Sequence, residues 1–160
     1  MGFEDQKKQA INNLRAAEKV GDMDVELKPL LDAINTLPDY YTTSSCAGRI
    51  VLMLDLGGKG KDKFQEKWHR KVTPKEVHAA LKTSKGTVWF RYECPILHIM
   101  ARTPEKAHEF LHVARESGFK RSGIQSLKEE RILIEVLSTE RIDAPIMEKG
   151  KKLVSDEYIT

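Results

Sequence analysis

The feature that most constrains this chain is an abrupt change of residue character between positions 39 and 56. Residues 39–46 read Asp-Tyr-Tyr-Thr-Thr-Ser-Ser-Cys, and residues 50–54 read Ile-Val-Leu-Met-Leu. The second run places apolar side chains on both faces of an extended chain, which is typical of a central strand covered on both sides. The first run lacks the Gly and Pro that dominate ordinary turns. It fits either a sheet edge, whose Ser and Thr bond their own backbone, or a binding segment supported by the strand beside it.

Helix signals occur at four places in the sequence. Apolar spacing predicts a helix over residues 3–20 that closes at Gly21, and a second one over residues 28–37 with Pro29 in its first turn. Thr73-Pro74-Lys75-Glu76 is a capping box that starts a helix ending near Lys82, and Thr103-Pro104 starts another. The two capped segments align over six positions, which indicates either an internal duplication or two independent solutions to capping a helix.

The remaining segments are strand-like. Besides residues 49–56, we predict strands over residues 67–72, 87–93, 95–101, 119–127 and 130–138. The order of elements predicts an α+β fold in which helices pack on a mixed β-sheet, and not a doubly wound dinucleotide fold. At 160 residues, the chain is expected to form one domain over residues 1–160.

Composition narrows the classes of function only slightly. The net charge of +3 is too small to indicate nucleic-acid binding by itself. Cys46 and Cys94 lack the spacing of a zinc or redox pair, so we expect a reduced, cytoplasmic protein. No segment has the length of a membrane span, and the polar start does not resemble a signal peptide. We therefore expect neither a membrane partner nor a metal.

Positive charge is concentrated between Gly57 and Lys75, where seven basic side chains accompany two acidic ones. The Gly-rich part matches neither phosphate-binding motif, because Gly60-Lys61 is followed by Asp62 where a P-loop has Ser or Thr. An aromatic plane beside cations suits RNA bases and phosphates, although an edge strand guarded by charge would look the same. The candidate tRNA-binding residues are Lys59, Lys61, Lys63, Trp68, His69, Arg70 and Lys71.

Residues 108–112 match the zinc-protease pattern H-E-x-x-H literally. If Ala107, Phe110, Leu111 and Ala114 form the buried helix face, His108 and His112 lie on its flank, where a partly wet position does not favour a zinc site. The third-ligand candidates are Glu129, Glu130 and Glu135. A zinc peptidase is therefore the weakest interpretation.

The run from Asp39 to Ile50 resembles the signature of the wybutosine-synthesis tRNA methyltransferase family. Other segments follow in the order of that family: Phe3-Glu4, residues 30–35, Trp68-His69, residues 95–99, residues 116–119 and residues 122–124. The family usually has Ser where this chain has Ala47. The resemblance therefore implies no catalytic hydroxyl at that position.

The resemblance implies transfer of a methyl group from S-adenosylmethionine to a ring nitrogen of the tricyclic base beside the anticodon of phenylalanine tRNA. It favours the RNA interpretation of the basic segment. It also raises His98, which shares a strand face with Ile96 and Met100, from a core histidine to a candidate proton acceptor. The candidate catalytic residues are Ser45, His98 and Arg49, and the candidate donor-binding residues are Ser44, Ser45, Ser122 and Gly123.

Alternation along an extended chain predicts that Ser45 and Arg49 share a face, with Ser44 and Cys46 on the other. His98 would meet them only if its strand neighbours theirs. The rival function is a tRNA-binding module without catalysis, in which the hydroxyl-rich segment only packs.

Overall fold

The computed structural model describes residues 2–82, 85–129 and 131–159. They form two compact units, each assembled from two stretches of chain. The first unit comprises residues 1–47 and 95–139, and the second comprises residues 48–94 and 140–160. Whether both belong to one domain over residues 1–160 stays a prediction.

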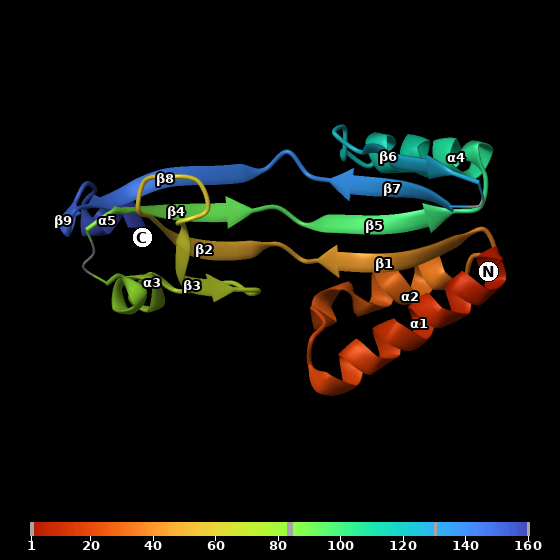
Figure 1. Ribbon diagram of the computed structural model, residues 1–160, viewed down its shortest axis with the longest axis horizontal. Helices are drawn as coiled ribbons and strands as arrows, with labels where there is room; N and C mark the ends of the chain where they lie inside the picture. Colours follow the sequence, from red (N-terminus) through yellow and green to blue (C-terminus); the bar gives the residue numbers. More distant parts are fainter. Residues whose placement is uncertain (1, 83–84, 130, 160) are drawn as a thin grey trace. The chain divides into compact units, whose positions relative to one another are not determined.

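The first unit is a four-stranded antiparallel sheet with strand order β1-β5-β7-β6 and helices packed on it (Figure 1). Its elements are α1 (Phe3–Val20), the short 3-10 helix η1 (Val25–Leu27), α2 (Lys28–Thr36), β1 (Tyr40–Cys46), β5 (Ile96–Ala101), α4 (Pro104–Glu116), β6 (Gly123–Lys128) and β7 (Arg131–Leu137). Helices α1 and α2 contact β1, whereas α4 contacts β5, β6 and β7.

Each face of this sheet has its own apolar contacts. On one face Ile99, Ile132 and Ile134 pack with Ala107 and Leu111 of α4. On the other face Tyr41 and Met100 pack with Phe3 of α1. The rings of Phe3 and Tyr41 meet edge to face, with centroids 5.1 Å apart. The packing of Phe3 against Tyr41 and Met100 fixes the N-terminal end of α1 over the sheet.

The second unit is a five-stranded antiparallel sheet with strand order β3-β2-β4-β8-β9. Its elements are β2 (Arg49–Asp55), β3 (Lys63–Trp68), α3 (Pro74–Ala80), β4 (Thr87–Glu93), β8 (Arg141–Glu148), β9 (Lys151–Lys152) and α5 (Asp156–Ile159). Leu52 and Val88 are fully buried in its core with Val77 of α3. Strand β2 is thus a central strand, as its apolar run predicts.

The α+β class is confirmed, but the expected single mixed sheet is wrong. All strand pairs among the described residues are antiparallel, and they form two sheets. The strand predicted over residues 67–72 is also wrong, since β3 ends at Trp68. The strand predicted over residues 130–138 is β7, and residue 130 lies outside the described residues.

The helix starts and stops follow the predicted caps. Gly21 has φ 73° and ends α1, which a residue with a Cβ atom would do less readily. Thr73 and Glu76 form the full capping box of α3, and Thr103 caps α4 through the backbone N–H of Lys106. The possible internal duplication of these two helices stays a prediction. None of the described helices combines the length and the apolar character needed to cross a bilayer.

Candidate active site

A β-bulge in β1 shapes the hydroxyl-rich segment. Thr42 pairs with Ile99 of β5, but the next recorded pair is Ser45 with Leu97, so Thr43 and Ser44 both lie opposite His98. One extra residue in a strand bends it and redirects its side chains. The regular alternation assumed from sequence therefore fails between Thr42 and Ser45. Ser44 turns toward His98, whereas Ser45 pairs with Leu97, which packs in the cluster of α4. The two serines thus still point to opposite sides of β1, although both residues contribute to the lining of one cavity.

Four side chains from four neighbouring strands form a continuous hydrogen-bonded row in the first unit. The Ser44 Oγ lies 2.8 Å from His98 Nδ1. On the other side of the ring, His98 Nε2 lies 2.9 Å from Glu135 Oε2. The second oxygen of Glu135 accepts a 2.7 Å hydrogen bond from the Gln125 amide. We call Ser44, His98, Glu135 and Gln125 the polar row.

The polar row lies on the sheet face that carries α1. His98 and Met100 lie two residues apart in β5 and therefore share a face, as do Glu135 and Leu133 in β7. Both Met100 and Leu133 belong to the cluster around Phe3. The side chains of His98 and Glu135 are 25% and 22% exposed. The row is thus partly shielded from water but still reachable.

A cavity of about 410 Å³ adjoins the Ser44 end of the polar row. It lies among α1, the 22–27 segment, α2 and β1. Its apolar lining residues are Ala10, Leu14, Ala17, Met23, Leu27 and Leu31, and its polar ones are Asn13, Asp22, Thr43, Ser44 and Ser45. Ligand sites typically measure about 300–1,000 Å³ and combine apolar walls with a few polar groups. This cavity has both properties.

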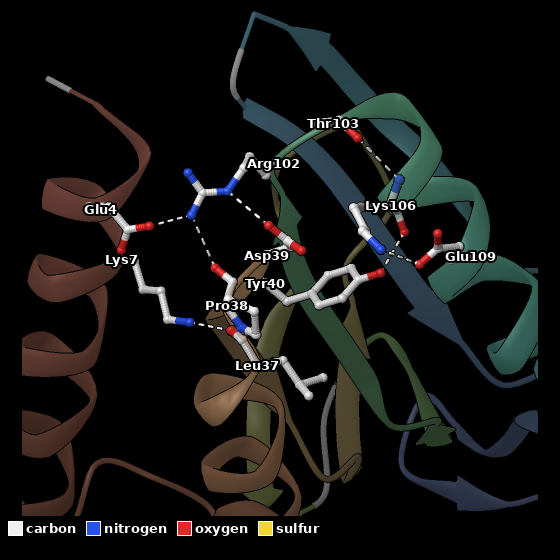
Figure 2. A network of polar contacts seen from close by, with 10 residues as sticks. All are labelled: Glu4, Lys7, Leu37, Pro38, Asp39, Tyr40, Arg102, Thr103, Lys106 and Glu109. Carbon is white, nitrogen blue, oxygen red and sulfur yellow. Dashed lines mark hydrogen bonds and ion pairs between the residues drawn. The ribbon is translucent and has the colours of Figure 1, made fainter.

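A polar network holds α1, one wall of the cavity, against the sheet (Figure 2). Arg102 follows β5 and pairs with Asp39 at 2.9 Å and with Glu4 of α1, while its guanidinium lies 4.3 Å from the centre of the Phe3 ring. Lys7 of α1 donates to the carbonyl of Leu37. Burial lowers the pKa of Lys7, with smaller opposing contributions from nearby carboxylates. These contacts join α1 to the segment that leads into β1.

The same network reaches α4. The hydroxyl of Tyr40 donates to the carbonyl of Lys106 at 2.9 Å, and the Lys106 ammonium pairs with Glu109 (Figure 2). Burial is the main cause that raises the pKa of Tyr40, so its phenol stays protonated and donates this bond. Tyr40 thereby anchors the start of β1 on the sheet face opposite the cavity.

The hydroxyl oxygen of Ser45 is buried and has no hydrogen-bond partner among the described residues. Buried polar groups are nearly always paired, so an orphan needs an explanation. Ser45 lines the cavity. A ligand with a donor or acceptor group at this wall would complete its hydrogen bonding.

The remaining predicted residues lie elsewhere. Arg49 begins β2 in the second unit, where it pairs with Glu93, and Gly48 with φ 97° interrupts the extended chain between it and Ser45. The assumption of one continuous strand through Ser45 and Arg49 is therefore wrong. In contrast, the expected adjacency of the strands of Ser45 and His98 is confirmed, since β1 pairs with β5.

Ser122 and Gly123 do not line the cavity. Ser122 is 3% exposed, and its hydroxyl accepts a hydrogen bond from the backbone N–H of Leu137 at 3.3 Å. Gly123 pairs with Glu135 across β6 and β7, directly beside the polar row. Their predicted role in donor binding stays a prediction.

The basic segment belongs to the second unit. Trp68 packs against the core of that unit, which makes it a less accessible stacking surface than the sequence suggests. Arg70 pairs with Glu76 at 2.6 Å. The other predicted cations, Lys59, Lys61, Lys63 and Lys71, are exposed, as is His69. The candidate RNA surface therefore consists mainly of lysines around the 57–62 loop.

The zinc-protease pattern lies on the outside of α4. His108 and His112 are exposed, while Ala107, Leu111 and Ala114 form the buried face, as predicted. Glu109, the general base of such a motif, instead pairs with Lys106. This placement favours a solvated helix surface.

Sequence reasoning does not identify Glu135 and Gln125 as members of the polar row. It offers Glu135 only as a candidate third zinc ligand. The alternation of Ile132, Ile134 and Val136 does show that Glu135 points to the opposite face of its strand. Gln125 carried no usable signal, because it is the extra residue of a bulge in β6.

Comparison with known proteins defines the class. A family model described as Methyltransferase TYW3 matches residues 5–160. The class is therefore a methyltransferase. The chain belongs to the Methyltransferase TYW3 family, and the resemblance found in the sequence is confirmed.

Relatives and solved structures agree. A Pyrococcus abyssi protein named tRNA(Phe) 7-((3-amino-3-carboxypropyl)-4-demethylwyosine(37)-N(4))-methyltransferase 1 is 43% identical over 160 residues, which cover 98% of this chain and 82% of the relative. A Methanocaldococcus jannaschii protein named as the same kind of methyltransferase is 39% identical, with 99% and 84% covered. The structure of PH1069 from Pyrococcus horikoshii matches with TM-score 0.90 and 40% identity, covering 99% of this chain and 83% of that one.

Proposed function

We propose that this chain transfers a methyl group from S-adenosylmethionine to N4 of 7-(3-amino-3-carboxypropyl)-4-demethylwyosine at position 37 of phenylalanine tRNA. The names of its relatives support this substrate. The observation that carries the proposal is that Ser44 both lines a ligand-sized cavity and contacts the imidazole of His98. Binding and proton transfer thus meet at one side chain.

The cavity fits the methyl donor by its chemistry. Its apolar wall from α1 and α2 suits the adenine and the methylene groups of the methionine part, and its hydroxyls suit polar groups of the ligand. The buried hydroxyl of Ser45, which has no hydrogen-bond partner among the described residues, is the group that would gain most from a polar group of the ligand. When bound, S-adenosylmethionine supplies a methyl carbon activated by a sulfonium. The protein then contributes mainly by holding the two reactants in line.

The nitrogen that attacks must lose its proton, and the chain offers an acceptor for it. His98 accepts through Nδ1, the atom that Ser44 contacts. A positioned general base typically contributes about 10²- to 10⁴-fold to the rate. Ser44 is the connecting hydroxyl, a role beyond the donor binding predicted from sequence.

The exposed cations of the second unit are the proposed contacts for the tRNA backbone. Lys59, Lys61 and Lys63 surround the loop between β2 and β3. Their charge attracts phosphates regardless of sequence, so they position the tRNA, while the base itself is selected at the cavity. We place this reaction in the cytoplasm, a location predicted by the cysteine pattern.

The test is methyl transfer from labelled S-adenosylmethionine to phenylalanine tRNA that carries the unmethylated tricyclic base. We expect one methyl group per tRNA for the wild type, and at least a roughly 100-fold lower rate for His98→Ala with its fold retained. A tRNA-binding module would instead bind tRNA but give no heat with S-adenosylmethionine in calorimetry. Labelling of tRNA that lacks the tricyclic base would contradict the proposed substrate.

A further inference from the structure

We propose that Glu135, held by Gln125, is a positioning residue for methyl transfer, which keeps the proton of neutral His98 on Nε2 so that Nδ1 can accept a proton through Ser44. The inference rests on the proposed function of this site. Neither the family match nor the names of the relatives assigns a role to Glu135 or Gln125.

Two bulges on opposite edges of the sheet build the polar row. The bulge in β1 places Thr43 and Ser44 opposite His98. In β6 the recorded pairs pass from Ile124 with Ile134 to Ser126 with Leu133, so Gln125 is the extra residue. Both edge strands therefore depart from regular alternation where they flank the central His98–Glu135 pair. Bulges that redirect side chains are common beside active sites.

The space beside Gly123 is open. Gly123 is the direct partner of Glu135 in β6, and a Cβ atom placed there would meet nothing within 4 Å. The side chain of Gln125 approaches Glu135 from the neighbouring bulge position. Glu135 is thus held from both sides, by His98 through one oxygen and by Gln125 through the other.

The hydrogen-bonding chemistry selects one tautomer of His98. An ionised carboxylate only accepts hydrogen bonds, so the ring nitrogen 2.9 Å from Glu135 must carry the proton. In a neutral imidazole the other nitrogen, Nδ1, then has a free lone pair. The Ser44 hydroxyl, 2.8 Å away, donates its proton to that lone pair. Its oxygen is left to accept a proton from the direction of the cavity.

The proton path balances in one step. The N–H bond of the base breaks, and its electron pair forms the bond to the methyl carbon as the carbon–sulfur bond of the donor breaks with its pair on sulfur. The released proton passes to Ser44 Oγ while the Ser44 proton passes to His98 Nδ1. The resulting imidazolium is paired with Glu135. A carboxylate has the same two tasks in Ser-His-Asp sites, where it orients the ring and stabilises its charged form.

The first experiment measures the tautomer directly. In ¹⁵N-histidine-labelled wild-type protein, we expect the His98 signal, assigned by its loss in His98→Gln, to show the proton on Nε2. In Glu135→Gln the amide offers a donor to Nε2, so we expect a larger fraction with the proton on Nδ1. A wild-type His98 that is protonated on Nδ1 and neutral would overturn the inference, whatever the activity.

The second experiment separates positioning from binding. We expect Glu135→Gln to lower kcat about 10- to 100-fold, less than the loss of about 10⁴ seen when a fully buried carboxylate of this kind becomes an amide, since Glu135 is 22% exposed. The KM values for tRNA and donor should stay within twofold of wild type, and Glu135→Asp should recover part of kcat. The matched control is Glu116→Gln, an exposed residue at the end of α4, which should match wild type.

The outcomes distinguish the two proposals. A wild type that methylates its tRNA, with Glu135→Gln equally fast and equally folded, overturns the positioning role alone. Raised KM values with unchanged kcat also overturn it, because Glu135 would then bind substrate. A wild type that transfers no methyl group overturns the proposed function, and the positioning role with it.

Discussion

Ser45 offers a test in which stability and binding are expected to change in opposite directions. Its hydroxyl oxygen is buried without a partner among the described residues, and Ser45 is one of the residues that line the cavity. A buried polar group without a partner costs about 1–3 kcal/mol. Ser45→Ala removes that cost from the free protein, so we expect it to be more stable by about 1 kcal/mol at the lower end of this range.

The same change should weaken donor binding. If the Ser45 hydroxyl gains its partner from S-adenosylmethionine, losing one hydrogen bond of about 0.5–1.5 kcal/mol raises the dissociation constant roughly 2- to 12-fold. A stability change of 1 kcal/mol shifts the melting temperature of a protein of this size by about 2–4 °C. Thermal unfolding without ligand and calorimetry with the donor measure the two effects separately.

Ser122 provides the matched control. It is also a buried serine, but its hydroxyl accepts a hydrogen bond from Leu137, so Ser122→Ala should lower the melting temperature. Weaker donor binding in this variant would support its predicted role as a donor-binding residue. For Ser45→Ala, a lower melting temperature would show that its hydroxyl already has a partner. A higher one with unchanged donor affinity would show that the donor is not that partner.

Two further predictions concern the second unit. Neutralising any two of the exposed lysines should weaken tRNA binding and reduce its salt slope by roughly 1–2 units. These lysines are Lys59, Lys61, Lys63 and Lys71. Neutralising Lys120 and Lys128 of the first unit should leave the slope unchanged. The second prediction is a pH dependence, because hydrogen bonds from Arg70 and Thr73 lower the pKa of Glu76 to about 2. This lowered pKa stabilises the folded state above the unfolded pKa of Glu76, and the contribution disappears as the pH falls toward 2. Glu76→Gln should therefore lose less stability on acidification than wild type in unfolding curves between pH 5 and about 2, and equal losses would contradict the assignment.

Local chemistry made the helices and several strands predictable. The Thr-Pro starts of α3 and α4 and the Gly21 stop of α1 depend on bonds within a few residues, so the sequence states them directly. Strand β8 was missed because Pro145 and its charged residues hide the pattern. The two separate sheets were not predictable from strand patterns, because alternation shows which face of a strand is buried but not which strand lies beside it.

The candidate site was predicted only where side chains follow regular alternation. His98 belongs to such a strand, and its placement on the face of Met100 is confirmed. Ser44 lies at a bulge, where one inserted residue brings Ser44, and not Ser45, opposite His98. The error for Arg49 has the same origin, since Gly48 with φ 97° ends the extended segment that the argument assumed.

The bulges in β1 and β6, which alternation in the sequence does not predict, also explain why the site lies where it does. Strands β1 and β6 are the edges of their sheet, and an edge strand has unpaired backbone groups that invite pairing with other chains. A bulge makes an edge less suitable for such pairing and at the same time frees a side chain from the regular pattern. Here the freed side chains, Ser44 and Gln125, both turn toward the central pair of His98 and Glu135. The regular central strands hold the imidazole and carboxylate in fixed register, while the irregular edges supply the groups that orient them.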